Sequence, residues 1–216
     1  MGRRGGCNGG RGRDTPHSTH THTHILFSPS LSHTHTFLLR CSLATNTHTH
    51  THTHTPLPNL QSKLRDDGAV ILADHLEENR SLRVLDLRCC EIGQVGSIKL
   101  ASLLIQGSML TQLLLGGNRA GDRGAEAFSV ALTQSKHIRV LDLSNNGILD
   151  QGLSALAEGV STNATLGELK LWGNSFGDGA ASLFLQLFEG RFQYYELLTD
   201  FRPYTVDDRT LIAQQQ

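Results

Sequence analysis

The sequence of 216 residues predicts an α/β solenoid, built from repeated strand–loop–helix units and preceded by a disordered N-terminal tract. Three observations support this prediction. A leucine-rich line of nine residues occurs four times at intervals of 28 residues, an apolar helical stripe follows each line, and residues 1–55 are of low complexity. We therefore divide the chain into a disordered His/Thr tract over 1–55, a solenoid over 56–190 and a C-terminal cap or hairpin over 191–216.

The four lines share one pattern, which is L-x-x-L-x-L-x-x-N/C, the signature of leucine-rich repeats. They read LRVLDLRCC, LTQLLLGGN, IRVLDLSNN and LGELKLWGN, beginning at Leu82, Leu110, Ile138 and Leu166. A strand alternates its side chains, so the leucines at positions four and six point into a core and the residue between them points away. We expect the residue at position nine to form a structural hydrogen-bond ladder between repeats. The residues at that position are Cys90, Asn118, Asn146 and Asn174.

Each line is followed by a segment with the periodicity of an amphipathic helix. Apolar residues stand four apart, which places them on one helical face toward the sheet. These pairs are Leu100 and Leu104, Phe128 and Leu132, Leu156 and Val160, and Phe184 and Phe188. Asp122, Asp150 and Asp178 recur two residues ahead of the predicted helices. We interpret them as N-terminal caps of those helices and not as catalytic groups.

The N-terminal tract alternates His and Thr, as expected of a translated CA dinucleotide repeat. Neither residue supplies an apolar face, so we predict disorder over residues 1–55. The alternative is opportunistic metal chelation by His48, His50, His52 and His54. The helical half of an earlier repeat is recognisable at 66–76, but Pro56 and Pro58 interrupt the place of its strand. We expect this first repeat to lack its strand and the array to be truncated.

Composition excludes several classes of function. The four cysteines form neither a disulfide framework nor a Cys-x-x-Cys metal motif, which favours an intracellular location, cytoplasmic or nuclear. No apolar run is long enough for a membrane span. The sequence has no Walker A or dinucleotide-binding glycine motif and no plausible catalytic set. We therefore expect a protein that is not an enzyme, has no cofactor or metal, and binds neither a specific nucleic acid nor a membrane.

The 28-residue unit with a full helix resembles the ribonuclease-inhibitor-like class of leucine-rich repeats. Members of this class include ribonuclease inhibitor, the sensor regions of nucleotide-binding immune receptors and the activating protein of the Ran GTPase. The C-terminal segment, from Thr199 to Asp207, also resembles the segment that follows the last repeat in one family of this class, although Asp208 replaces a glycine. A fifth line would begin at Tyr194, but Thr199 and Arg202 break it, and the alternation around Asp207 and Asp208 suggests a hairpin.

The resemblance implies a protein–protein interaction scaffold that binds its partner on the concave strand face. The alternative is a regulator of a small GTPase or a sensor fragment of a nucleotide-binding immune receptor. Trp172 is predicted to be either an exposed anchor or packed against the C-terminal cap. The convex helices are expected to expose small or polar residues. The predicted partner-binding residues are Asp86, Arg88, Leu114, Asp142, Lys170 and Trp172.

Overall fold

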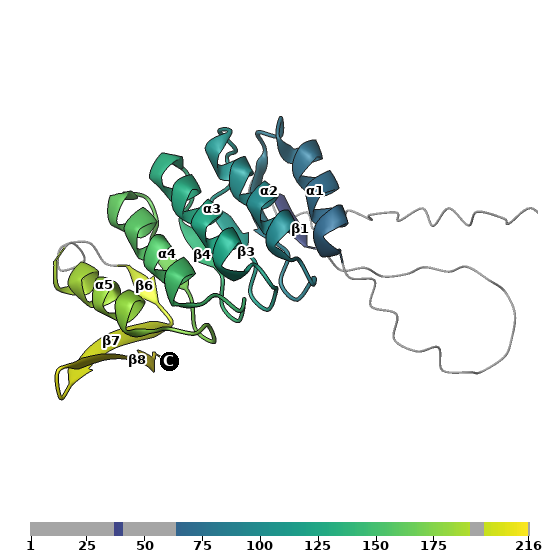
Figure 1. Ribbon diagram of the computed structural model, residues 1–216. Helices are drawn as coiled ribbons and strands as arrows, with labels where there is room; N and C mark the ends of the chain where they lie inside the picture. Colours follow the sequence, from purple (N-terminus) through teal and green to yellow (C-terminus); the bar gives the residue numbers. More distant parts are fainter. Residues whose placement is uncertain (1–36, 41–63, 191–196, 216) are drawn as a thin grey trace, which may run out of the picture.

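A computed structural model describes residues 37–40, 64–190 and 197–215. Strands and helices alternate along most of the chain, and Figure 1 shows helices α1 to α5 stacked in sequence order along an arc. The helices are α1 (Arg65–Leu76), α2 (Gln94–Ile105), α3 (Gly121–Gln134), α4 (Asp150–Thr162) and α5 (Asp178–Glu189). The strands are β1 (Phe37–Arg40), β2 (Leu82–Asp86), β3 (Gln112–Leu114), β4 (Val140–Asp142), β5 (Glu168–Lys170), β6 (Leu198–Thr199), β7 (Phe201–Val206) and β8 (Arg209–Gln214).

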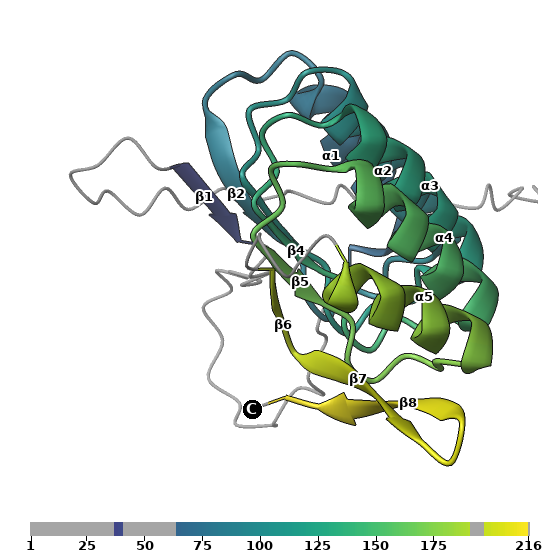
Figure 2. The ribbon, with the colours of Figure 1, turned by 90° about the vertical axis from the view of Figure 1, so that its left-hand side faces the viewer.

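The first six strands form one parallel sheet in sequence order. Leu85, Leu113, Leu141 and Leu169 are register partners from strand to strand, and all four are fully buried. Helices α1 to α5 cover one face of this sheet, as Figure 2 shows. The helical stripe meets the leucines there, with Leu100, Phe128, Leu156 and Phe184 fully buried in the same core. The predicted leucine-rich-repeat solenoid of α/β class is confirmed.

Strand β1 differs from what the sequence predicts. It lies within the tract expected to be disordered, yet its backbone pairs in parallel with β2, joining Leu39 to Leu85 and Arg40 to Asp86. The first repeat therefore has a strand, supplied by a short apolar segment well upstream of the expected position 54–62. The rest of the tract, including the four histidines of the metal alternative, lies outside the described residues.

Two of the three recurrent aspartates, Asp122 and Asp150, cap helices, but not the helices predicted. Asp150, in the first turn of α4, accepts hydrogen bonds from the N–H groups of Gly177 (2.9 Å) and Ala180 (2.8 Å) at the start of α5. Asp122 does the same for α4, and Asp66 for α2. Each carboxylate thus caps the helix of the next repeat, because the stacked helix N-termini lie side by side. These caps join neighbouring repeats.

The C-terminal unit is longer than the others and closes the core. Glu168 pairs with Leu198 and Leu169 with Thr199, so the step is 30 residues and the fifth line begins two residues later than predicted. Phe201 consequently takes the core position of a leucine and is fully buried. Its ring centroid lies 5.0 Å from that of Phe184 and 5.2 Å from that of Phe176. Strands β7 and β8 then form an antiparallel hairpin that turns at Asp207 and Asp208.

Candidate functional site on the concave face

The concave face is the face of the sheet that is free of helices, as Figure 2 shows. Its side chains alternate with the core leucines along each strand. Parallel register aligns positions three, five and seven of each line into three rows across β2 to β5. The first row is Val84, Gln112, Val140 and Glu168; the middle row is Asp86, Leu114, Asp142 and Lys170; the third is Arg88, Gly116, Ser144 and Trp172. All six predicted partner-binding residues therefore lie on one surface.

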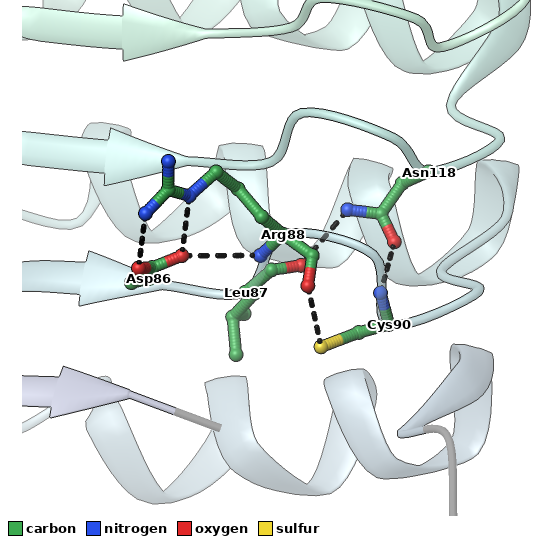
Figure 3. A network of polar contacts seen from close by, with 5 residues as sticks. All are labelled: Asp86, Leu87, Arg88, Cys90 and Asn118. Atoms are coloured by element: carbon green, nitrogen blue, oxygen red, sulfur yellow. Dashed lines mark hydrogen bonds and ion pairs between the residues drawn. The ribbon is translucent and has the colours of Figure 1, made fainter. Parts of the chain in front are cut away.

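Asp86 and Arg88 form a closed ion pair at one end of this surface. The Asp86 carboxylate accepts hydrogen bonds from Arg88 Nε (2.9 Å) and Nη2 (2.8 Å), as Figure 3 shows. This hydrogen bonding, followed by the opposite charge, raises the pKa of the Arg88 guanidinium above its usual value. Arg88 remains exposed, but Asp86 is only 7% exposed because Arg88 folds back over it. The expectation that Asp86 faces solvent was wrong.

Asp142 is also buried, at 5% exposed, where the sequence suggested an accessible acid. Its Oδ1 accepts hydrogen bonds from the Ser144 hydroxyl (2.6 Å) and the Ser144 N–H (3.0 Å). The carboxylate leans over Gly116, where an added Cβ would lie 3.0 Å from its oxygens. The absence of a side chain at Gly116 therefore gives Asp142 room to turn inward. Asp86 and Asp142 position neighbouring groups and offer little surface of their own.

Leu114, Lys170 and Trp172 are half-buried and form the accessible centre of the concave face. Lys170 Nζ lies 3.0 Å from Glu168 Oε1, and this hydrogen bond is the largest cause of the raised pKa of Lys170. Trp172 packs in part against the hydrophobic core, so the indole is neither fully exposed nor fully covered. The role of Trp172 as an anchor for a partner stays a prediction.

Sequence reasoning missed Asp200, which directly follows β6, the strand next to β5 in the sheet. Its carboxylate accepts hydrogen bonds from the N–H groups of Leu171 (2.8 Å) and Trp172 (3.1 Å to Oδ2). Burial raises the pKa of Asp200, and these N–H donors oppose the rise without cancelling it. The order Asp200-Phe201 repeats that of Asp86-Leu87 and Asp142-Leu143. This signal was hidden by the assumption of a constant 28-residue step.

The asparagines at position nine join neighbouring repeats beside this surface. Asn118 Oδ1 accepts hydrogen bonds from the N–H groups of Cys90 and Ile92, both at 3.0 Å. Its Nδ2 donates to the carbonyl oxygens of Leu87 (2.9 Å) and Leu115 (2.7 Å), the first of which is drawn in Figure 3. Asn174 joins its unit to that of Asn146 in the same way. Its Oδ1 accepts hydrogen bonds from the N–H groups of Asn146 and Ile148, and its Nδ2 donates to the Leu143 carbonyl. The ladder fixes the loops from which the concave side chains project.

The convex face differs from the expectation of small or polar residues. Helix α2 exposes Val95 (61%), Ile98 and Ile105, and α3 exposes Val130. These positions belong to the outer faces of the helices, away from the sheet. The prediction was wrong because the apolar stripe that faces the sheet does not determine which residues the outer face of each helix carries. Part of the convex surface is therefore apolar.

No group of three or more His, Cys, Asp or Glu side chains in the described part of the chain could hold a metal ion. Nor does any helix of the described segments combine the length and apolar character needed to cross a membrane.

Comparisons with known proteins agree with this geometry. A family model described as "Leucine Rich repeat" matches residues 78–101 and 134–157. The pig ribonuclease inhibitor is 32% identical over 119 residues, which are 54% of this chain and 26% of the relative. A solved structure titled "Leiomodin-1 Actin-Binding Site 2 (ABS2)" superposes with a TM-score of 0.52 at 20% identity, covering 63% of this chain and 79% of its own, and it supports the fold alone.

Repeat geometry and matches together define a ribonuclease-inhibitor-like leucine-rich-repeat protein. The particular protein whose C-terminal segment the sequence resembles is leucine-rich repeat-containing protein 34. Its rat form is 31% identical over 153 residues, 70% of this chain. The human "NACHT, LRR and PYD domains-containing protein 12" is 41% identical over 107 residues, 49% of this chain. The aligned part spans 36% of the former and 10% of the latter.

Proposed function

We propose that this protein binds another protein through the concave face of its sheet, without catalysing a reaction. One observation carries the proposal: Leu114 at the end of β3, and Lys170 and Trp172 at and just after the end of β5, keep accessible surface on one face of the sheet, on either side of β4. Arg88, which follows β2 on the same face, is exposed. Repeat solenoids form extended concave surfaces that bind partners. One relative, the pig ribonuclease inhibitor, is named for a protein that it inhibits. Asp86 and Asp142 contribute by holding Arg88 and Ser144 in place.

The spacing of these residues suits a compact anchor. Neighbouring strands lie about 4.8 Å apart, so Leu114 and Lys170 are separated by roughly 10 Å across β4. Trp172 stands two residues beyond Lys170 and already packs in part on the core, which limits the entropy lost on binding. Covering the rest of the indole could contribute about 2 kcal/mol, the scale of a hot spot.

The two cations of this face, Arg88 and Lys170, are each held in an ion pair. Glu168 pairs with Lys170, and Asp86 pairs with Arg88. A charge reversal at Lys170 would place a fourth carboxylate beside Glu168, Asp142 and Asp200. That substitution therefore changes the local field strongly while leaving the buried leucines intact.

The test is site-specific photo-crosslinking in extracts of cells that express the protein. A photoreactive residue replaces Gln112 on the concave face or, as a control, exposed Thr133 on α3. We expect one crosslinked partner from position 112, lost with Lys170→Glu and kept with the matched reversal Arg123→Glu on α3. Both variants must retain the wild-type melting temperature. Equal crosslinking from position 133, or an unchanged product with Lys170→Glu, would refute the concave site.

A second candidate function is the sensor region of a nucleotide-binding receptor. The observation that favours it is the 41% identity to the human NACHT, LRR and PYD domains-containing protein 12. Sequencing the natural transcript tests this alternative, which requires a nucleotide-binding domain in the same reading frame. Cys89 is an exposed free thiol. We accordingly place either function inside the cell, in the cytoplasm or nucleus.

A further inference from the structure

We propose that one edge of the solenoid binds an acidic segment of a protein partner. The surface, here called the basic rim, consists of Arg80, Arg83, Lys136 and Arg139. These residues lie in or just after the α1–β2 and α3–β4 connections, where helices end and strands begin. The basic rim adjoins the concave face but uses none of its partner-binding residues, so this inference stands independently of the proposed function.

The repeat brings the four cations together along one edge. Arg83 and Arg139 occupy the same repeat position on either side of Thr111. The Thr111 N–H donates to the Arg83 carbonyl (2.8 Å), and the Arg139 N–H donates to the Thr111 carbonyl (2.7 Å). Two strand spacings, roughly 10 Å, therefore separate the two arginine backbones. Arg80 and Lys136 are equivalent in the same way, two repeats apart.

Hydrogen bonds to backbone carbonyls orient the three guanidinium groups without neutralising them. Arg80 Nη1 donates to the Glu77 and Gly107 carbonyls, both at 3.1 Å. Arg83 Nη1 donates to the Arg80 carbonyl (2.9 Å), and Arg139 Nη1 to the Thr165 carbonyl (3.2 Å). A guanidinium has five N–H donors, so each keeps donors for a ligand. Partial ordering before binding also lowers the entropic cost of association.

The charge of the basic rim is not compensated within the described chain. No ion pair there involves any of its four cations, whereas Arg65, Arg88, Lys99, Arg119 and Lys170 each have a carboxylate partner. The connections at 106–111, 134–139 and 162–167 contain no Asp or Glu. Nearby Glu77 is bound by Lys99 at 2.6 Å, which leaves Glu78 as the adjacent exposed acid. The C-terminal ends of α1 and α3, which carry a partial negative charge from the helix dipole, reduce the positive potential of the basic rim only in part.

The arrangement favours a carboxylate-bearing peptide over a nucleic acid. Guanidinium groups bind carboxylates through two parallel hydrogen bonds. A peptide in the polyproline II conformation has three residues per turn and rises about 3.1 Å per residue, so acids three residues apart lie on one face about 9 Å apart, close to the Arg83–Arg139 spacing. Nucleic-acid surfaces combine longer cationic tracks with aromatic stacking groups. The segments 77–83, 106–111, 134–139 and 162–167 contain no Phe, Tyr or Trp, and their one imidazole is that of His137.

Fluorescence anisotropy on the full chain tests this proposal. The probe is a labelled twelve-residue peptide with Glu at every third position in a Gly/Ser background, compared with its Lys counterpart and with single-stranded DNA of twelve nucleotides. We expect the Glu peptide to bind and the Lys peptide not to bind. Arg83→Gln combined with Arg139→Gln should weaken the Glu peptide about ten-fold, as expected for two exposed charge pairs.

The matched control removes two exposed cations elsewhere, with Arg123→Gln and Arg209→Gln, and should change the affinity less than about two-fold. If the double rim variant fails to fold, Lys136→Gln replaces it, with an expected weakening of about three-fold. Equal weakening in the control, tighter binding of DNA than of the Glu peptide, or no binding at all would overturn the proposal. Lys170→Glu should leave the affinity unchanged. A loss of affinity in the Lys170→Glu variant would place the peptide on the concave face and refute the proposed binding at the basic rim.

Discussion

The asparagine ladder leads to a graded prediction, in which Asn118→Ala destabilises the protein more than Asn146→Ala. Both side chains are buried, and both occupy position nine of their repeats. Asn118 Oδ1 accepts two backbone N–H groups, those of Cys90 and Ile92. Asn146 Oδ1 accepts one, that of Ala120, at 3.2 Å. The two substitutions therefore leave different numbers of backbone N–H donors without their acceptor, two for Asn118→Ala and one for Asn146→Ala.

The remaining bonds of Asn146 are duplicated by neighbouring groups. Its Nδ2 donates to the Leu115 and Ser144 carbonyls. The first of these carbonyls also accepts from Asn118 Nδ2, and the second from the Gly117 N–H. In Asn146→Ala only the Ala120 N–H therefore loses its hydrogen-bond acceptor, at a cost of about 1–3 kcal/mol. Asn118→Ala removes the acceptor of two donors, so we expect about 2–6 kcal/mol.

Urea unfolding followed by far-ultraviolet circular dichroism measures the difference. The slope of the unfolding free energy against urea should not change, since both variants expose the same surface on unfolding. Gln134→Ala, at an exposed position on α3, is the control and should stay within about 0.5 kcal/mol of wild type. A cost for Asn146→Ala equal to or greater than that for Asn118→Ala would refute this account of the ladder.

Three further predictions concern the core, the caps and the C-terminal end. Leu141→Ala should cost about 2–5 kcal/mol in thermal or urea unfolding, because the side chain is fully buried in the middle of the array; a near-neutral result would contradict the register. Asp150→Ala should cost about 1–2 kcal/mol because it removes the cap of α5, whereas Asp178→Ala at an exposed position should be close to neutral in the same assay. Asp200 should titrate above its ordinary pKa of 3.8 by carboxyl-carbon NMR. Because the folded-state pKa is raised, protonation stabilises the fold below 3.8 and this contribution is lost as pH rises through the folded value, so the stability of wild type relative to Asp200→Asn should fall between about pH 3 and 6; a flat difference would exclude the raised pKa.

Sequence periodicity determined the repeat architecture of this protein. The alternation in Leu85-Asp86-Leu87 and its equivalents identifies which side chains enter the core, because a strand allows only two directions. The 28-residue interval then requires parallel stacking, and the asparagine at position nine indicates a ladder. These features depend on a short segment and its repetition, so they are visible without coordinates.

Contacts between repeats were decided by the tertiary structure. The sequence shows that Asp150 precedes a helix, but only stacking places its carboxylate on the N–H groups of the following one. Asp86 projects from the concave side as predicted, yet the fold of Arg88 over it determines its burial. The two extra residues before β6 bring Phe201 into the core and Asp200 to the sheet edge. Periodicity specifies the direction of a side chain within its own unit, whereas its partners depend on how a neighbouring unit packs and how long the connecting loop is.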